Sequence, residues 1–372
     1  MKTTTLPVAL LLALTACGSA PAPEATPPPP ATATPAPTAT ATATAQNTAA
    51  AAPVEPSPEE KAKAKAAANL EKDRAKAEAE RIAEAARWTP ELHAAVKPLA
   101  EKAYSNGHAA LLAVVAGKHR RPASPERDKD RHPVETFDFY GFQPNMTVLE
   151  FAPGEGWFTE LLAPALAKKG KLICTSTDPN GPKEERTTFY GQRFKDFLGR
   201  SPEIFGKVET LIISPAAPKL GLEGTVDMVL MMRALHGVVN AGKLDVWLAE
   251  AHKALKPKGI LAIEQHRAPA DAKPEESAKN GYLPEAWLIE RIEAAGFKLA
   301  AKSEINANPK DTKDHPEGVW TLPPTYRLGD KDHDKYAAIG ESDRMTLKFL
   351  KVTPDATKKT IPATKAPPPV KK

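Results

Sequence analysis

The sequence predicts an α/β fold with a mostly parallel, doubly wound sheet that ends in a late antiparallel strand. Three observations lead to this prediction. Short apolar segments alternate with amphipathic segments between residues 147 and 295, as they do in strands joined by helices. The apolar run 226–232 is nearly continuous, which is typical of a strand covered on both faces. A tight glycine turn joins the first expected strand to the first expected helix of the alternating region.

The individual elements follow from the spacing of the apolar residues and from the positions of glycine and proline. Glycines stop two helices, at Gly117 and Gly296, and Pro164 should shorten or kink a third. The expected strands are 147–151, 171–176, 208–214, 226–232, 259–264, 297–305 and 344–349. The expected helices are 90–104, 108–116, 157–168, 184–198, 241–255 and 284–295. The two late strands are separated by about 38 residues, a long polar connection.

Composition sets the limits of this domain. Many of the 38 prolines fall in the first 60 or last 20 residues, so the folded part is expected at 89–352. Residues 17–58 are almost entirely Ala, Pro, Thr and Glu and should form a disordered linker. Residues 59–88 are rich in Ala, Lys, Glu and Arg and predict a charged helical spacer, with partner binding as the alternative. Residues 353–372 form a Lys/Pro tail that should be disordered.

The first seventeen residues have the pattern of a secretory leader. Lys2 precedes a short apolar run, and the run ends in Leu14-Thr15-Ala16-Cys17. This ending resembles the bacterial lipobox, which implies a signal peptide over 1–16 and lipid on Cys17. Gly18, in place of the Asp that often follows in inner-membrane lipoproteins, implies an outer-membrane lipoprotein facing the periplasm. Several acyl chains would anchor the protein stably to the membrane.

Charge and cysteine content exclude other classes of protein. A net charge of +5 on 372 residues is mild and does not predict nucleic-acid binding, which needs a clustered basic patch. The chain has two cysteines, Cys17 and Cys174, and the first lies in the leader. A structural disulfide and a thiolate metal site are therefore not expected.

The glycine turn is the most informative motif. Residues 148–162 read strand, Ala152-Pro-Gly-Glu-Gly156, then helix. Glycines let a ligand approach the backbone, and the helix N-terminus offers free N–H groups. A dinucleotide site would require a third glycine or alanine where this chain has Thr159, so the turn does not predict one.

The turn resembles the first motif of class I S-adenosylmethionine-dependent methyltransferases, a Rossmann-like family. Glu150, Gly154 and Gly156 match that motif, while Ala152 replaces its first glycine. The resemblance implies that these four residues cradle S-adenosylmethionine and that Asp178 holds its ribose hydroxyls. The whole of 90–350 resembles predicted methyltransferases that bear signal peptides. The segments that carry this are 127–133, 151–157 and 305–316.

Candidate catalytic side chains lie at two strand ends. The fourth strand runs into Arg233 and His236, and the fifth into Glu264 and His266. We expect His236, His266 and Glu264 to act as a base or to orient the acceptor, because these ends should open on the cofactor face.

Two polar loops are expected to close over the site or bind the substrate. One contains Arg131 and His132, and the other contains Asp314 and His315. Arg233 is likewise expected to contact the substrate or a closing loop.

Three functions fit these observations. The first is an envelope methyltransferase acting on a small molecule or an envelope component. The second is a ligand-binding module that keeps the fold without methyl transfer. The third is a metal-dependent hydrolytic enzyme, for which the candidate ligands are His132, His236, His266, His315 and Asp314.

Overall fold

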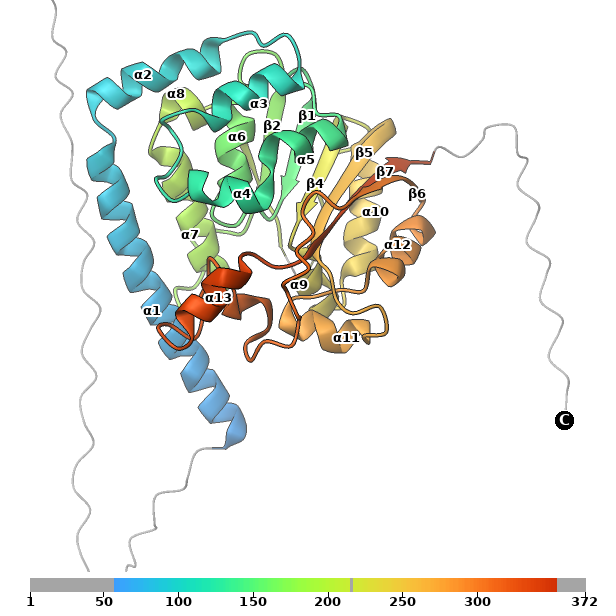
Figure 1. The fold of residues 1–372 in the computed structure, drawn as a ribbon. Helices are drawn as coiled ribbons and strands as arrows, with labels where there is room; N and C mark the ends of the chain where they lie inside the picture. Colours follow the sequence, from blue (N-terminus) through green and yellow to red (C-terminus); the bar gives the residue numbers. More distant parts are fainter. Residues whose placement is uncertain (1–56, 215–216, 353–372) are drawn as a thin grey trace, which may run out of the picture. The chain divides into compact units, whose positions relative to one another are not determined.

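A computed structural model describes residues 57–214 and 217–352 (Figure 1). The predictions for the leader, Cys17, most of the linker and the tail concern residues outside these ranges. The helical segment predicted before the domain is present as α1(Pro58–Arg87). Its N-terminus is closed by a capping box, in which Ser57 and Glu60 each accept the other's backbone N–H. Within the described ranges, no helix combines the length and apolar character needed to cross a bilayer.

The sheet has seven strands in the order β3-β2-β1-β4-β5-β7-β6. Strands β1 to β5 pair in parallel, and β7 lies antiparallel between β5 and β6. The predicted fold class is therefore confirmed, including the late antiparallel strand. The strands are β1(Thr147–Phe151), β2(Lys171–Ser176), β3(Glu209–Ile212), β4(Val226–Met232), β5(Leu255–His266), β6(Phe297–Ser303) and β7(Arg344–Lys351).

Helices cover both faces of this sheet. After α1 they are α2(Pro90–Glu101), α3(Gly107–Val115), α4(Asp128–Arg131), α5(Pro133–Tyr140), α6(Trp157–Leu166), α7(Arg186–Gly199), α8(Pro202–Phe205), α9(Leu235–Asn240), α10(Leu244–Ala254), α11(Pro274–Ser277), α12(Glu285–Ala294) and α13(His333–Ile339). The helix predicted at 157–168 continues through Pro164 and ends two residues early. Helix α5 was not predicted; Pro133 starts it, and Phe137 and Tyr140 bury its inner face.

Successive strand residues contribute to different cores. In β1, Val148 packs with α3, α5 and α6, whereas Leu149 packs with α10 and α12. In β4, Leu230 belongs to the first layer, and Val229 and Met231 belong to the second. Because side chains alternate across a strand, burial on both faces requires the nearly continuous apolar run seen in β4.

Helix α1 contacts the domain mainly through ion pairs. Three arginines that recur every seventh residue at α7 carry them: Arg186 pairs with Asp73 at 2.6 Å, Arg193 with Glu80 at 2.9 Å, and Arg200 with Glu84 at 3.2 Å. Both sets of numbers increase together, so the two helices run in parallel. Leu70 of α1 is buried as well, at 5% exposure. The docking of α1 should therefore depend on salt. Its role as a spacer stays a prediction.

We expect the double substitution Asp73→Lys and Glu80→Lys to loosen α1. Partly exposed ion pairs contribute up to about 1 kcal/mol, so amide hydrogen exchange in α1 should accelerate about fivefold while exchange in β1 and β4 stays unchanged. The matched control is Glu59→Lys with Glu71→Lys, which changes the same charge on exposed positions of the same helix. Equal exchange in both variants would show that these ion pairs do not hold α1.

Candidate functional site

The glycine turn lies where the strand order reverses. The chain passes from β1 to β2 and β3 on one side, then returns to place β4 on the other side of β1. Ligands of open α/β sheets bind beyond the strand carboxyl ends at such a switch point. The turn between β1 and α6 leaves the carboxyl end of β1 at this point. It contains three left-handed residues, with φ of 49° at Ala152, 59° at Gly154 and 78° at Gly156.

The two glycines of the turn meet different surroundings. A Cβ on Gly154 would have no atom within 4 Å, so that residue faces open space. A Cβ on Gly156 would lie 2.6 Å from the Phe197 ring. Ala152 is strained in the position where the matching motif has glycine, and its N–H donates to Thr175 Oγ1 at 2.8 Å. The open side of the turn is therefore at Gly154.

Glu150 lies fully buried near the end of β1. Its Oε2 accepts from Thr159 Oγ1 at 2.7 Å and lies 3.6 Å from Cys174 Sγ. Burial raises the pKa of Glu150 to about 7, although both hydrogen bonds lower it. Thr159, which departs from the dinucleotide-binding pattern, thus donates a hydrogen bond to Glu150. The Glu150 carboxyl is about half protonated near neutral pH.

The negative charge of the turn itself is neutralised. Glu155 pairs with Arg193 at 2.9 Å and with Arg121 at 3.7 Å. Desolvation by neighbouring groups would raise the pKa of Glu155, but these arginines together lower it, so the exposed Glu155 carboxylate is ionised. Its charge is therefore balanced by α7 and by the segment after α3.

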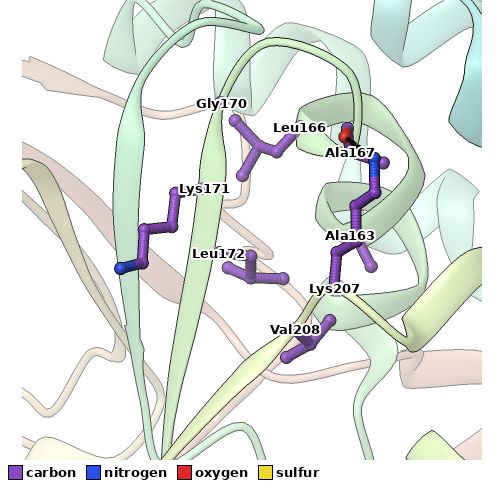
Figure 2. Close-up of a pocket in the computed structure, with 8 residues that line it drawn as sticks. All are labelled: Ala163, Leu166, Ala167, Gly170, Lys171, Leu172, Lys207 and Val208. Atoms are coloured by element: carbon purple, nitrogen blue, oxygen red, sulfur yellow. Dashed lines mark hydrogen bonds between the residues drawn. The ribbon is translucent and has the colours of Figure 1, made fainter.

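A cleft of 2460 Å³ opens beside the turn. The turn forms part of its wall, together with Arg233, His236, His266 and Trp320. Side chains of α1 line it as well. A second, much smaller hollow lies between α6 and the first residues of β2, at the opposite end of the strands from the turn (Figure 2). Its volume of 10 Å³ is below that of a cofactor and near that of one water molecule.

The strand ends of β4 and β5 meet through a buried carboxylate. Glu264 is fully buried and does not line the cleft; its Oε1 accepts from Arg233 Nη1 at 2.7 Å and lies 3.2 Å from Arg344 Nε. Arg233 has a left-handed backbone, with φ of 56°. The role of Glu264 as a base stays a prediction; its contacts are those of an anchor for Arg233 and Arg344.

His236 and His266 come together as the sequence suggested. Their ring centroids are 5.8 Å apart, and both residues line the cleft. Burial lowers the pKa of His236 to about 4 and that of His266 well below its usual value, with His236 and Arg233 adding to the effect at His266. His266 Nδ1 lies 2.5 Å from Ser342 Oγ. Both imidazoles are therefore neutral at pH 7.

The other predicted residues are spread more widely. Arg131 lines the cleft, whereas His132, Asp178, Asp314 and His315 are not among its lining residues. Asp178 is exposed after β2 and accepts from Asn180 N–H at 2.8 Å. His132 lies 3.4 Å from Asn306, His315 is buried 2.8 Å from Asp311, and Asp314 is exposed beside Thr312. The structure thus groups Arg131 and Arg233 with the histidine pair.

Sequence reasoning missed Glu341, Arg127 and Arg344, which lie beside this group. Glu341 is buried and accepts from Arg131, from Arg127 at 2.8 Å and from Arg344 at 2.5 Å. They meet because the antiparallel β7 brings its first residue opposite the last residue of β5. The available signal was the charged sequence Glu341-Ser-Asp-Arg344 directly before an apolar strand.

The metal hypothesis receives no geometric support. Across 57–214 and 217–352, no group of three or more His, Cys, Asp or Glu side chains is arranged to hold a metal ion. The candidate histidines are divided instead between the cleft and separate hydrogen bonds with Asn306 and Asp311.

Comparison with known proteins gives similarity of fold. No protein-family model matches the chain, and no curated protein matches it. A methyltransferase structure from Aquifex aeolicus, described as dependent on S-adenosylmethionine, is 19% identical with a TM-score of 0.40; the match covers 62% of this chain and 94% of that one. The [4+2]-cyclase SpnF is 15% identical with a TM-score of 0.44, covering 65% and 92%. A putative sarcosine dimethylglycine methyltransferase from Galdieria sulphuraria is 12% identical with a TM-score of 0.41, covering 60% and 84%. Likeness at this level assigns no activity.

We expect Glu150→Gln to stabilise the protein increasingly as pH rises. The pKa of Glu150 is raised in the folded protein. Its contribution to the free energy of unfolding is therefore fully present below about pH 4.5, the ordinary pKa of Glu, and is lost as pH rises through about 7. Glutamine cannot ionise and keeps an oxygen for Thr159. The variant should therefore gain about 3 kcal/mol relative to wild type between pH 5 and pH 9, measured by urea unfolding.

Glu160→Gln is the matched control. Glu160 is also fully buried, and burial opposes its ionisation, but Arg121 and Arg200 together lower its pKa. This variant should lose stability at neutral pH and show no gain toward pH 9. A constant difference between Glu150→Gln and wild type across the range would show that Glu150 does not titrate there.

Proposed function

We propose that this protein is a class I S-adenosylmethionine-dependent methyltransferase tethered to the bacterial envelope through lipid on Cys17. One observation carries the enzymatic part of the proposal. The left-handed turn from Ala152 to Gly156 lies at the switch point of the sheet, and its residues 152–155 line a large cleft. This is the position at which an α/β sheet of this order receives a nucleoside-type ligand.

The residues of the turn fit the proposed cofactor. The open side at Gly154 gives room for close approach to the backbone, and the N-terminus of the ten-residue α6 supplies N–H groups and positive dipole to a carboxylate. Glu155 does not oppose this, because Arg193 and Arg121 neutralise it. Glu150, Ala152, Gly154 and Gly156 would hold the amino-acid end, and Asp178 on the loop after β2 is proposed for the ribose.

The histidine pair fits proton removal from a methyl acceptor. When bound, S-adenosylmethionine supplies a methyl group on a sulfonium centre for in-line displacement. An acceptor hydroxyl or amine must lose a proton in such a reaction, and a neutral imidazole can take it. If His266 Nδ1–H donates to Ser342 Oγ, its Nε2 carries the lone pair that accepts. His236 lies beside it and orients the acceptor.

The location is proposed from the leader alone. Lipid on Cys17 would place the domain at the outer membrane facing the periplasm, with a small molecule or envelope component as substrate. A module that binds the ligand without methyl transfer would share the same turn. Methyl transfer to an acceptor therefore needs its own assay once binding is measured.

Calorimetry with S-adenosylhomocysteine and the full-length chain tests the cofactor site. We expect binding by the wild type and a loss of at least about tenfold in Gly154→Arg, whose side chain would fill the open side of the turn.

Gly221→Arg is the matched control for this test. Gly221 also has a left-handed φ, of 64°, and open space, but does not line the cleft. It should bind like the wild type. The proposal fails if the wild type does not bind the ligand, or if both variants bind it equally.

A further inference from the structure

Three guanidinium groups form one part of the cleft wall. Arg127 and Arg131 come from the segment before β1, and Arg233 follows β4. We call Arg127, Arg131 and Arg233 the arginine face. The first two share the carboxylate of Glu341, and Arg233 is close enough to lower the pKa of both Arg127 and Glu341.

The positive charge of this region exceeds the negative charge that contacts it. With the buried Arg344, four guanidiniums share the carboxylates of Glu264 and Glu341. Arg344 contacts both carboxylates. Burial, together with Arg233, lowers the pKa of Arg127 despite the opposing effects of Glu341 and Glu155. Buried positive charge without a full complement of anions is costly, so an anionic ligand would be stabilised here.

The arginine face keeps hydrogen-bond donors for such a ligand. The side-chain hydrogen bonds of Arg127 and Arg131 in the described part of the chain run from Nε to Glu341. Those of Arg233 run from Nη1 to Glu264. The remaining terminal nitrogens have no hydrogen-bond partner among the described residues. A guanidinium can donate two parallel hydrogen bonds to a carboxylate or phosphate.

Aromatic and imidazole groups adjoin this face. The Arg233 guanidinium lies 5.0 Å from the Phe158 ring, and His236 packs 5.7 Å from Trp320. Phe158, His236 and Trp320 all line the cleft. An acceptor of small aromatic size could therefore hold an anionic group on the arginines and present a second group to the histidines.

We infer that the arginine face binds a carboxylate or phosphate group of the methyl acceptor, beside His236 and His266. The identification of the anion as part of a methyl acceptor rests on the proposed methyltransferase function. The presence of an anion site does not depend on that function. The substrate class is thus a small anionic molecule that carries a separate hydroxyl or amine for methylation.

Calorimetry on the full-length chain with three probes tests the site. Benzoate and phenyl phosphate carry the two anionic groups, and benzamide is the neutral counterpart of benzoate. We expect the better of the two anions to bind at least about tenfold more tightly than benzamide, and to weaken as salt is raised. Anions that bind no more tightly than benzamide would overturn the inference.

Two variants locate the anion on the arginine face. Arg127→Gln and Arg233→Gln should each weaken the preferred anion about tenfold and change S-adenosylhomocysteine binding less than twofold. Arg81→Gln removes another arginine of the cleft wall, which pairs with Glu78 within α1, and should leave both affinities unchanged. Thermal unfolding of each variant shows whether it is folded; the salt response of the wild type tests the site without any substitution.

The outcomes separate this inference from the proposed function. Loss of S-adenosylhomocysteine binding in the two variants, with anion binding intact, would place the cofactor's own carboxylate on the arginines and overturn the assignment to the acceptor. Arginine-dependent anion binding in a chain that does not bind S-adenosylhomocysteine would support the anion site and refute the methyltransferase. Anion binding that neither variant weakens would refute the arginine face.

Discussion

The buried carboxylate of Glu341 joins the parts of the chain on which the cleft depends. It accepts from Arg127 and Arg131, which precede β1, and from Arg344, which begins β7. Arg344 in turn reaches Glu264 at the end of β5 and the backbone oxygen of Asp130. Breaking a buried ion pair by removing one partner leaves an uncompensated charge and typically costs about 3–5 kcal/mol. Segments that are more than 200 residues apart in the sequence are thereby fixed around one edge of the sheet.

Burial has opposite effects on the acids and bases of this edge. It raises the pKa of Glu150 toward neutrality and lowers the pKa of His236 and His266. Each of these groups is thus driven toward its uncharged form. The permanent charge of the inner cleft comes from the ionised Glu155 and Glu341 and from a larger number of guanidiniums, which remain protonated in proteins. The cleft is therefore electrostatically positive, although the histidines contribute no charge near pH 7.

The sequence predicted what depends on local pattern. The strands could be predicted because a strand that is buried on both faces has a continuous run of apolar residues. The turn could be predicted because left-handed backbone positions favour glycine. The histidine pair followed from the rule that parallel strands end on one edge. The pairing of Arg127 with Glu341 could not be predicted, because it depends on the antiparallel register of β7 after a long connection. The docking of α1 was missed for a similar reason: a seven-residue spacing of arginines shows its meaning only when the partner helix is known.

Arg193 connects two features that were described separately. One of its terminal nitrogens donates to Glu155 in the glycine turn, and the other donates to Glu80 on α1. A ligand that moves or neutralises Glu155 changes the free energy with which α1 is held, because both carboxylates share one guanidinium. By thermodynamic reciprocity, the factor by which α1 docking alters ligand affinity equals the factor by which the ligand alters α1 docking. A mechanical force that pulls α1 away from the domain at its N-terminal end would accordingly change the affinity of the turn for its ligand.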